Sequence, residues 1–285
     1  MKSSINLRKV RNVVVVSDTH CGCQMGLCPP DGAKMDGGGR YSPSRLQLKM
    51  WGWWEEFWGD FVPHATSGEP FVVVHNGDVI DGVHHGSTTQ FSHNLHDQSE
   101  CAETILNPVV EKCDGRYYQV RGTEAHVGQS AVEEEILAKS VGATPNEEGQ
   151  HARWELWLNM YGHLVHFLHH IGTTSSAAHE ASAVNAELTS EFTEAARWGD
   201  KPPSVIVRSH RHRSIEIRLP ITDGYATATV TPAWQLKTPF AFKVAGSRLA
   251  PPQIGGLVIR VHKDTNEIFT RTWVRHIERS KEVVI

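Results

Sequence analysis

Carboxylate and imidazole side chains recur in pairs at the ends of four short apolar runs of this 285-residue sequence. Both groups are ligands of transition-metal ions, and histidine is the commonest of these ligands. The positions of the 18 histidines therefore matter. The pairs stand in the segments SDTH, NGDVIDG, HLVHFLHH and SHRH, and they are Asp18 with His20, Asp78 with Asp81, His169 with His170, and His210 with His212.

The runs that precede these pairs have the pattern of buried β-strands. RNVVVVSD, FVVVHNGD and SVIVRSH are continuously apolar, which is typical of strands covered on both faces, and YYQVRG and HLVHFLHH add two more. A single Asp after a strand is usually a turn former or a helix cap. Because ligands of an α/β sheet bind beyond the carboxyl ends of its strands, however, the ordered set of four pairs predicts a metal site.

Helical patterns separate these strands, so the chain is predicted to be α/β. Trp51, Trp54 and Trp58 recur at helical spacing, which favours a stripe buried in the core, and the alternative is that part of it lines a substrate cleft. Beyond residue 213 the pattern changes to strands joined by polar turns, which indicates an antiparallel β-rich segment. Helices are expected at about residues 44–61, 97–113, 130–141 and 181–198.

Composition limits the classes of function. The formal net charge of −4 lacks the basic excess of proteins that bind nucleic acid without sequence preference. The apolar runs are far shorter than the roughly 18 residues that span a bilayer. No apolar stretch of signal-peptide length opens the chain, so we expect a cytoplasmic protein without a membrane partner.

The five cysteines are an odd number, which favours free thiols over a disulfide framework. Cys21, Cys23 and Cys28 cluster beside His20 and raise the alternative of a structural zinc site. No second cysteine pair at zinc-site spacing follows, so we expect small thiols in the core or in loops.

The segments SDTH, NGDVIDG and SHRH, in this order and each after a strand, resemble the signature blocks of the calcineurin-like metallophosphoesterase superfamily. The resemblance covers roughly residues 12–213. It implies two packed mixed β-sheets flanked by helices, as a four-layer sandwich in a single domain of residues 1–285. The stretch 28–44 would be a loop insertion, and the β-rich tail 214–285 would complete the second sheet.

The resemblance also implies a centre of two divalent metal ions, with manganese favoured and iron or zinc as alternatives. Asp78 would bridge the two ions, and Asp81 would orient a ligand or tie the loop. His169 and His170 are alternatives for one ligand of the second ion, and we prefer His170. The other ligands would be Asp18, His20 and His212 at the first ion and His210 at the second.

The third signature block departs from the family pattern, because GTEAH replaces Gly-Asn-His followed by an acid. Thr123 stands in place of the Asn ligand, and Glu124 stands in place of the catalytic histidine. Glu124 could supply an oxygen ligand, or it could turn away and leave Thr123 or water to complete the site. A degenerate polar turn is the third interpretation. We prefer His126 as the proton donor, because the departing oxygen still needs one.

Two adjacent divalent metals activate water and stabilise phosphoryl transfer, so we predict hydrolysis of a phosphate ester. A phosphodiester is favoured as the substrate, with nucleic acids and nucleotides among the candidates. The small size and the irregular third block resemble those of bacterial or phage phosphoesterases. The alternatives are a phosphomonoesterase or protein phosphatase, or a metal-binding regulatory module without turnover. Candidate substrate contacts are Arg121, Arg208, Arg211, Arg213, His84 and His85.

Overall fold

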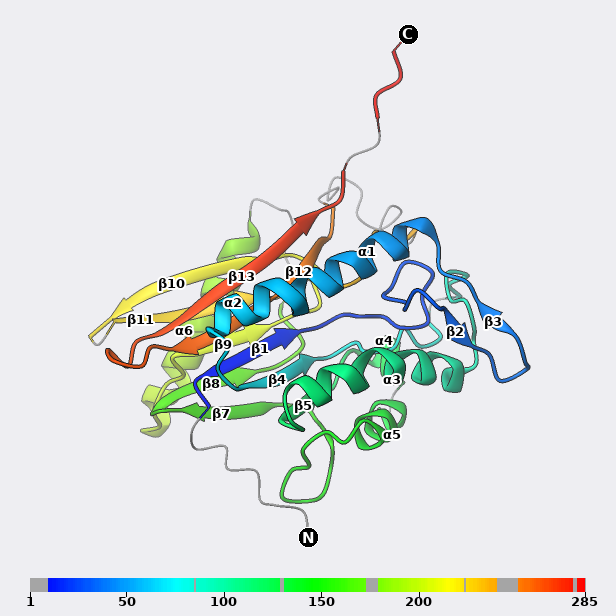
Figure 1. Ribbon diagram of the computed structural model, residues 1–285. Helices are drawn as coiled ribbons and strands as arrows, with labels where there is room; N and C mark the ends of the chain where they lie inside the picture. The colour runs from blue at the N-terminus through cyan, green and yellow to red at the C-terminus, as the bar shows by residue number, and fades with distance from the viewer. Residues whose placement is uncertain are drawn as a thin grey trace.

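The computed structural model describes residues 10–84, 86–128, 131–172, 179–222, 224–239, 251–278 and 281–284. Two mixed β-sheets face each other, and helices cover their outer faces (Figure 1). This arrangement confirms the predicted α/β fold of two packed sheets flanked by helices.

The first sheet is built around β1 (Asn12–Val16), β4 (Phe71–Asn76) and β5 (Tyr117–Val120), which run parallel to one another. In the described part of the chain its strand order is β13-β12-β1-β4-β5-β6. The other three strands are β6 (Ala152–Arg153), β12 (Gln253–Val261) and β13 (Ile268–His276).

The second sheet has β8 (His163–Phe167) and β9 (Val205–Arg208) at its centre, in parallel register. Within the described residues its order is β10-β11-β9-β8-β7. Its other strands are β7 (Leu156–Met160), β10 (Ile215–Ile221) and β11 (Gly224–Val230). The strand β7 was not expected from the sequence, because its exposed Trp157 and Asn159 interrupt the apolar run.

The C-terminal β-rich segment divides between the two sheets, so the expectation that it completes the second sheet is correct for β10 and β11 and wrong for β12 and β13. β10 and β11 extend the second sheet, whereas β12 pairs antiparallel with β1 of the first. Both strand pairs within the segment are antiparallel, as expected. Both β12 and β1 are apolar on both faces, which is typical of strands in the interior of a sheet. Each of them therefore pairs with a strand at both of its edges.

The helices lie close to the positions expected from the sequence. Ser44 caps α1 (Arg45–Glu56) through a capping box with Gln47, and Asn94 caps α3 (Leu95–Lys112). α1 continues into a π-helical turn, η2 (Phe57–Phe61), and then into α2 (Val62–Thr66). The remaining helices are α4 (Glu124–Val127), α5 (Val132–Ser140) and α6 (Glu180–Trp198).

Three apolar clusters hold the layers together. One joins α1, α3 and α5 to the outer face of the first sheet, the second lies between the sheets, and the third joins α6 to the second sheet. Trp54 and Trp58 are buried in the first cluster and Trp51 packs against it, so the tryptophan stripe belongs to the core, as expected.

The stretch 28–44 forms a short hairpin of β2 (Ala33–Lys34) and β3 (Arg40–Tyr41). The main-chain N–H of Asp36 in this hairpin donates to Asp97 of α3, which fixes the hairpin against the helix. The five cysteines are free and buried, as expected for thiols.

The fold brings the carboxyl ends of its central strands to one edge of the sandwich. β1 lies beside β4 in parallel register, with Val16 opposite His75. β8 lies beside β9, with Phe167 opposite Val207. The four residue pairs that follow these strands therefore meet at this edge.

Candidate metal centre

The turns that follow the strands have an unusual backbone. Asp18, His20, Asp78, His210 and His212 all have φ between 44° and 69°. This left-handed region is uncommon for residues with a side chain, and such conformations cluster at functional sites. Five of the expected ligands therefore hold their side chains in positions that extended strands would not give.

Asp18, His20 and His212 form the first group of candidate ligands. Nε2 of His212 lies 3.2 Å from Oδ1 of Asp18 and 3.3 Å from Nε2 of His20. The buried Oδ1 of Asp18 nevertheless has no aligned hydrogen-bond donor among the described residues. Two imidazole nitrogens and an unsatisfied carboxylate oxygen that face one another fit a divalent cation.

Asp78, His169 and His210 form the second group. Nε2 of His169 lies 3.0 Å from Oδ2 of Asp78, and Nδ1 of His210 lies 4.0 Å from the same oxygen. Nδ1 of His169 donates to the main-chain oxygen of Asn76 at 2.6 Å, so Nε2 is the nitrogen left for a ligand.

The choice between the two adjacent histidines depends on their burial. His169 is buried against Asp78, whereas the side chain of His170 is exposed, and its ring centroid lies 5.0 Å from that of His210. The structure thus favours His169 as the ligand over His170, which the sequence led us to prefer. His170 lies at the rim of the same group.

The two groups are neighbours, because Nε2 of His169 is also 4.0 Å from Oδ1 of Asp18. Burial raises the pKa of Asp18, but the adjacent His212 and His169 outweigh it and leave that pKa below its usual range. Burial lowers the pKa of His169, yet Asp78 and Asp18 raise it to about 10. The edge therefore concentrates ionised carboxylates that favour a positive charge.

The carboxylate of Asp81 orients a member of the first group, His20, through a hydrogen bond. It accepts from Nδ1 of His20 at 3.1 Å, from Nε2 of Gln90 at 2.5 Å and from Nε2 of Gln235 at 3.3 Å. Burial raises the pKa of Asp81, but hydrogen bonds from His20 and His84 bring it below the usual range. The ionised Asp81 thus fixes the ring of His20 with Nε2 toward Asp18 and His212.

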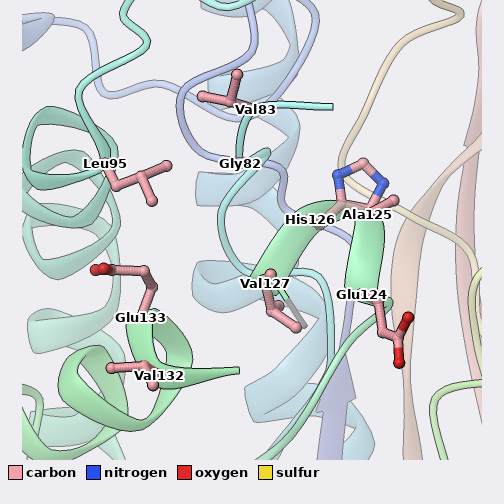
Figure 2. A pocket seen from close by; sticks show the side chains of 10 residues that line it. Gly82, Val83, Leu95, Glu124, Ala125, His126, Val127, Val132 and Glu133 are labelled. Carbon is pink, nitrogen blue, oxygen red and sulfur yellow. The ribbon is translucent and has the colours of Figure 1, made fainter. Parts of the chain in front are cut away.

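The variant loop contacts the second group through Thr123. The main-chain N–H of Thr123 donates to Oδ1 of Asp78 at 2.7 Å, and its hydroxyl lies 3.1 Å from the same oxygen. Thr123 therefore orients the carboxylate of a candidate ligand. The side chain of Glu124 is exposed and points away from the ring of His126 (Figure 2), so Glu124 does not join either group.

The side chain of His126 lies between the loop and the candidate ligands. Its Nδ1 donates to the main-chain oxygen of Asp81 at 2.7 Å, and its Nε2 lies 3.9 Å from Oδ2 of Asp78. The rings of His20 and His84 pack edge-on at 4.4 and 4.5 Å from its centroid. Burial lowers the pKa of His126 to about 4.

The arginines proposed as substrate contacts are engaged elsewhere. Arg208 is buried and paired with Glu187 and Glu191 of α6. The guanidinium of Arg121 lies 3.5 Å from Glu135 and over the ring of Trp154. Arg211 donates to the main-chain oxygen of Glu180, and Arg213 pairs with the side chain of Glu180. Of the two expected histidines, His84 lies beside His126, and His85 falls outside the described residues.

Sequence reasoning missed Glu134 of α5, which is buried behind the loop. Its carboxylate accepts from the main-chain N–H of Gly122 at 2.8 Å and from that of Val79 at 3.4 Å. These two peptides are next to Thr123 and Asp78 in the chain. The carboxylate of Glu134 therefore fixes the turn at Gly122 relative to the turn at Asp78. The sequence gives no signal for this role, because Glu134 lies in a run of three glutamates that resembles a solvated helix face.

No family model matches the chain, and no curated protein matches it. Solved structures do match. A Thermotoga maritima protein solved by NMR is 11% identical at a TM-score of 0.35, with 94% of this chain and 100% of that chain covered. Sulfate thiohydrolase SoxB of Thermus thermophilus, solved with glycerol, is 10% identical at a TM-score of 0.41, with 92% of this chain and 56% of that chain covered.

Among the described helices, none has the length and apolar character needed to cross a bilayer.

Proposed function

We propose that this protein is a dinuclear metal-dependent phosphoesterase that hydrolyses a phosphodiester. The observation that carries the proposal is the pair of adjacent ligand groups, Asp18 with His20 and His212, and Asp78 with His169 and His210. Mixed oxygen and imidazole ligands suit manganese, iron and zinc better than calcium, and we propose manganese.

Two bound divalent ions would supply an activated water and neutralise the phosphoryl oxygens. Other residues of the chain orient the side chains that would hold these ions. Asp81 and Asn76 orient the rings of His20 and His169, and Thr123 orients the carboxylate of Asp78.

His126 protonates the departing oxygen in the proposed reaction. Because its Nδ1 donates to a main-chain oxygen, Nε2 is the nitrogen that exchanges a proton with substrate. Burial and the neighbouring His20 lower the pKa of this ring to about 4, but a phosphate anion beside Nε2 favours the protonated ring, since an opposite charge raises its pKa.

The test combines metal content with hydrolysis. The purified protein is stripped with chelator and reloaded with manganese, and metal per chain is measured by elemental analysis beside turnover of an aryl phosphodiester and an aryl monoester. We expect two ions per chain and faster turnover of the diester. Asp78→Asn, which keeps the shape of the side chain, should lose both metal and turnover.

Three results would count against the proposal. Two bound ions without turnover of either ester would favour a metal-binding module without catalysis, and absence of bound metal would remove the proposed centre. Preferential turnover of the monoester would replace the diester by a phosphomonoester or phosphoprotein substrate.

A further inference from the structure

A pocket of about 280 Å³ opens beside His126, on the variant loop (Figure 2). Its walls come from residues 82–83, from the first residue of α3, from α4 and from the start of α5. This volume suits a small organic group rather than a macromolecular segment.

The lining of the pocket combines apolar side chains with carboxylates. Val83, Leu95, Val127 and Val132 supply apolar surface. Val83 and Val132 are 53% and 49% exposed, so this surface is open to an incoming group. An organic group with an apolar part can cover these side chains and remove them from water.

Two acids, Glu124 and Glu133, also line the pocket, and none of the described residues that line it is a lysine or an arginine. Neither carboxylate pairs with another residue in the part of the chain that the structure describes. Glu133 is half-buried, so its charge is only partly screened by water. The field in the pocket therefore opposes an anion and favours a neutral or cationic group.

The position of His126 connects this pocket to the proposed reaction. His126 lines the pocket, and its Nε2 lies 3.9 Å from Asp78 of the ligand groups. An oxygen that takes a proton from Nε2 must lie beside this ring. The alcohol that carries the oxygen is then adjacent to the pocket.

We propose that this pocket binds the leaving alcohol of the diester and selects a neutral or cationic alcohol with an apolar part over an anionic one. The inference rests on the proposed function. In the reaction, the oxygen of water bonds to phosphorus, the bond from phosphorus to the leaving oxygen breaks, and the proton of His126 goes to that oxygen. The proton that the attacking water gives up passes to solvent, and the imidazole of His126 takes one back for the next turnover. The products are a phosphomonoester and the free alcohol.

The same pocket disfavours polynucleotide substrates. In a nucleic acid the leaving group carries a further phosphate, which would approach Glu133 and Glu124 without a compensating cation from the pocket. Arg121 and Arg208 are already paired with carboxylates of the protein, and Arg211 donates from Nη1 to the main-chain oxygen of Glu180. A small diester therefore fits the site better than nucleic acid.

The experiment uses three methyl phosphodiesters that differ only in the second alcohol. The alcohols are choline, its neutral isostere 3,3-dimethylbutanol, and the anion 3-hydroxypropionate. Release of methyl phosphate by the manganese-loaded protein is followed by phosphorus NMR. We expect kcat/KM to fall in that order, by roughly threefold for each step, as for partly exposed charge pairs.

Charge reversal at the pocket gives the matched control. Glu133→Lys should bring the 3-hydroxypropionate ester above the choline ester. Glu111→Lys makes the same change at an exposed position of α3 outside the pocket, and it should keep the native order. Equal rates for the three esters, or an order unaffected by Glu133→Lys, would overturn the inference.

Binding of the free alcohols separates this inference from the proposed function. Choline and 3,3-dimethylbutanol are titrated into the protein, and the methyl NMR signals of Val127 and Val132 are followed. Shifts of these signals, stronger for choline and weakened in Glu133→Lys, support the pocket even in a preparation that hydrolyses no diester. Absence of shifts at both valines would overturn the inference, whatever the turnover.

Discussion

Nδ1 of His126 lies 2.7 Å from the main-chain oxygen of Asp81, the residue whose side chain holds the ring of His20. One short segment therefore orients both a candidate ligand and the proposed proton donor. Because a carbonyl oxygen can only accept, this hydrogen bond sets the tautomer of His126 and leaves Nε2 toward the ligand groups.

Removing the imidazole of His126 should affect substrates according to their leaving group. His126→Ala is expected to slow an alkyl diester by about 100-fold or more, since an alkoxide needs a proton as it departs. A nitrophenyl diester, whose phenolate leaves unaided, should lose far less. Steady-state kcat for both esters measures the difference, and metal content should stay at the native level. Equal losses for the two esters would argue against a proton-donating role.

The hydroxyl of Thr123 should matter through Asp78. Thr123→Val keeps the main-chain hydrogen bond to Asp78 but removes the hydroxyl contact at 3.1 Å, so manganese affinity should fall by about 10-fold or more. Thr123→Ser retains the hydroxyl and should bind manganese as the native chain does. Isothermal titration of chelator-treated protein measures both. Native affinity in Thr123→Val would show that the main-chain contact is sufficient.

Glu134 should make the metal-free protein less stable as the pH rises. Burial raises the pKa of Glu134 from 4.5 to about 7, so the folded state binds a proton that the unfolded state has lost between these values. The free energy of unfolding then falls across this window by at most about 3 kcal/mol and levels off above it. Urea denaturation at pH 5 and pH 8 should give a smaller difference for Glu134→Gln than for the native chain. An unchanged difference would mean that Glu134 is ionised throughout.

Trp234 should be among the most costly side chains to truncate. It is fully buried, its ring centroid lies 4.8 Å from that of Trp54, and its main-chain N–H donates to the oxygen of Asp18. Trp234→Ala should lower the free energy of unfolding by about 3–5 kcal/mol. Trp198, which is 77% exposed, provides the control. Trp198→Ala should change the free energy of unfolding by about 0.5 kcal/mol or less. Denaturant titration of both variants distinguishes them.

The alternation of strands and helices was predictable because it depends on local pattern. The apolar runs before Asp18 and Asp78 are strands, and the tryptophan stripe marks a buried helix face. The partners of the C-terminal strands were not predictable, since neither the alternating pattern of β10 nor the mostly apolar pattern of β12 specifies a neighbouring strand. Which sheet each one joins depends on contacts with residues far away in the chain.

The candidate site was also predictable only in part. The pairing of acids and histidines after strands indicated which residues could meet, and the parallel order of β1 with β4 and of β8 with β9 brought them together. The sequence could not choose between His169 and His170, because neighbouring residues in a turn point in different directions. The choice depends on the contact of His169 with Asp78 and Asn76.

By itself, then, the sequence indicated most of the helices and central strands and the acids and histidines of the candidate site, because periodicity and residue type are local properties. Only the tertiary structure decided that Glu124 turns outward, that Arg208 pairs with α6 and that Glu134 supports the loop. The direction of a side chain depends on left-handed turns and on partners from distant segments, and these exist only once the two sheets have packed.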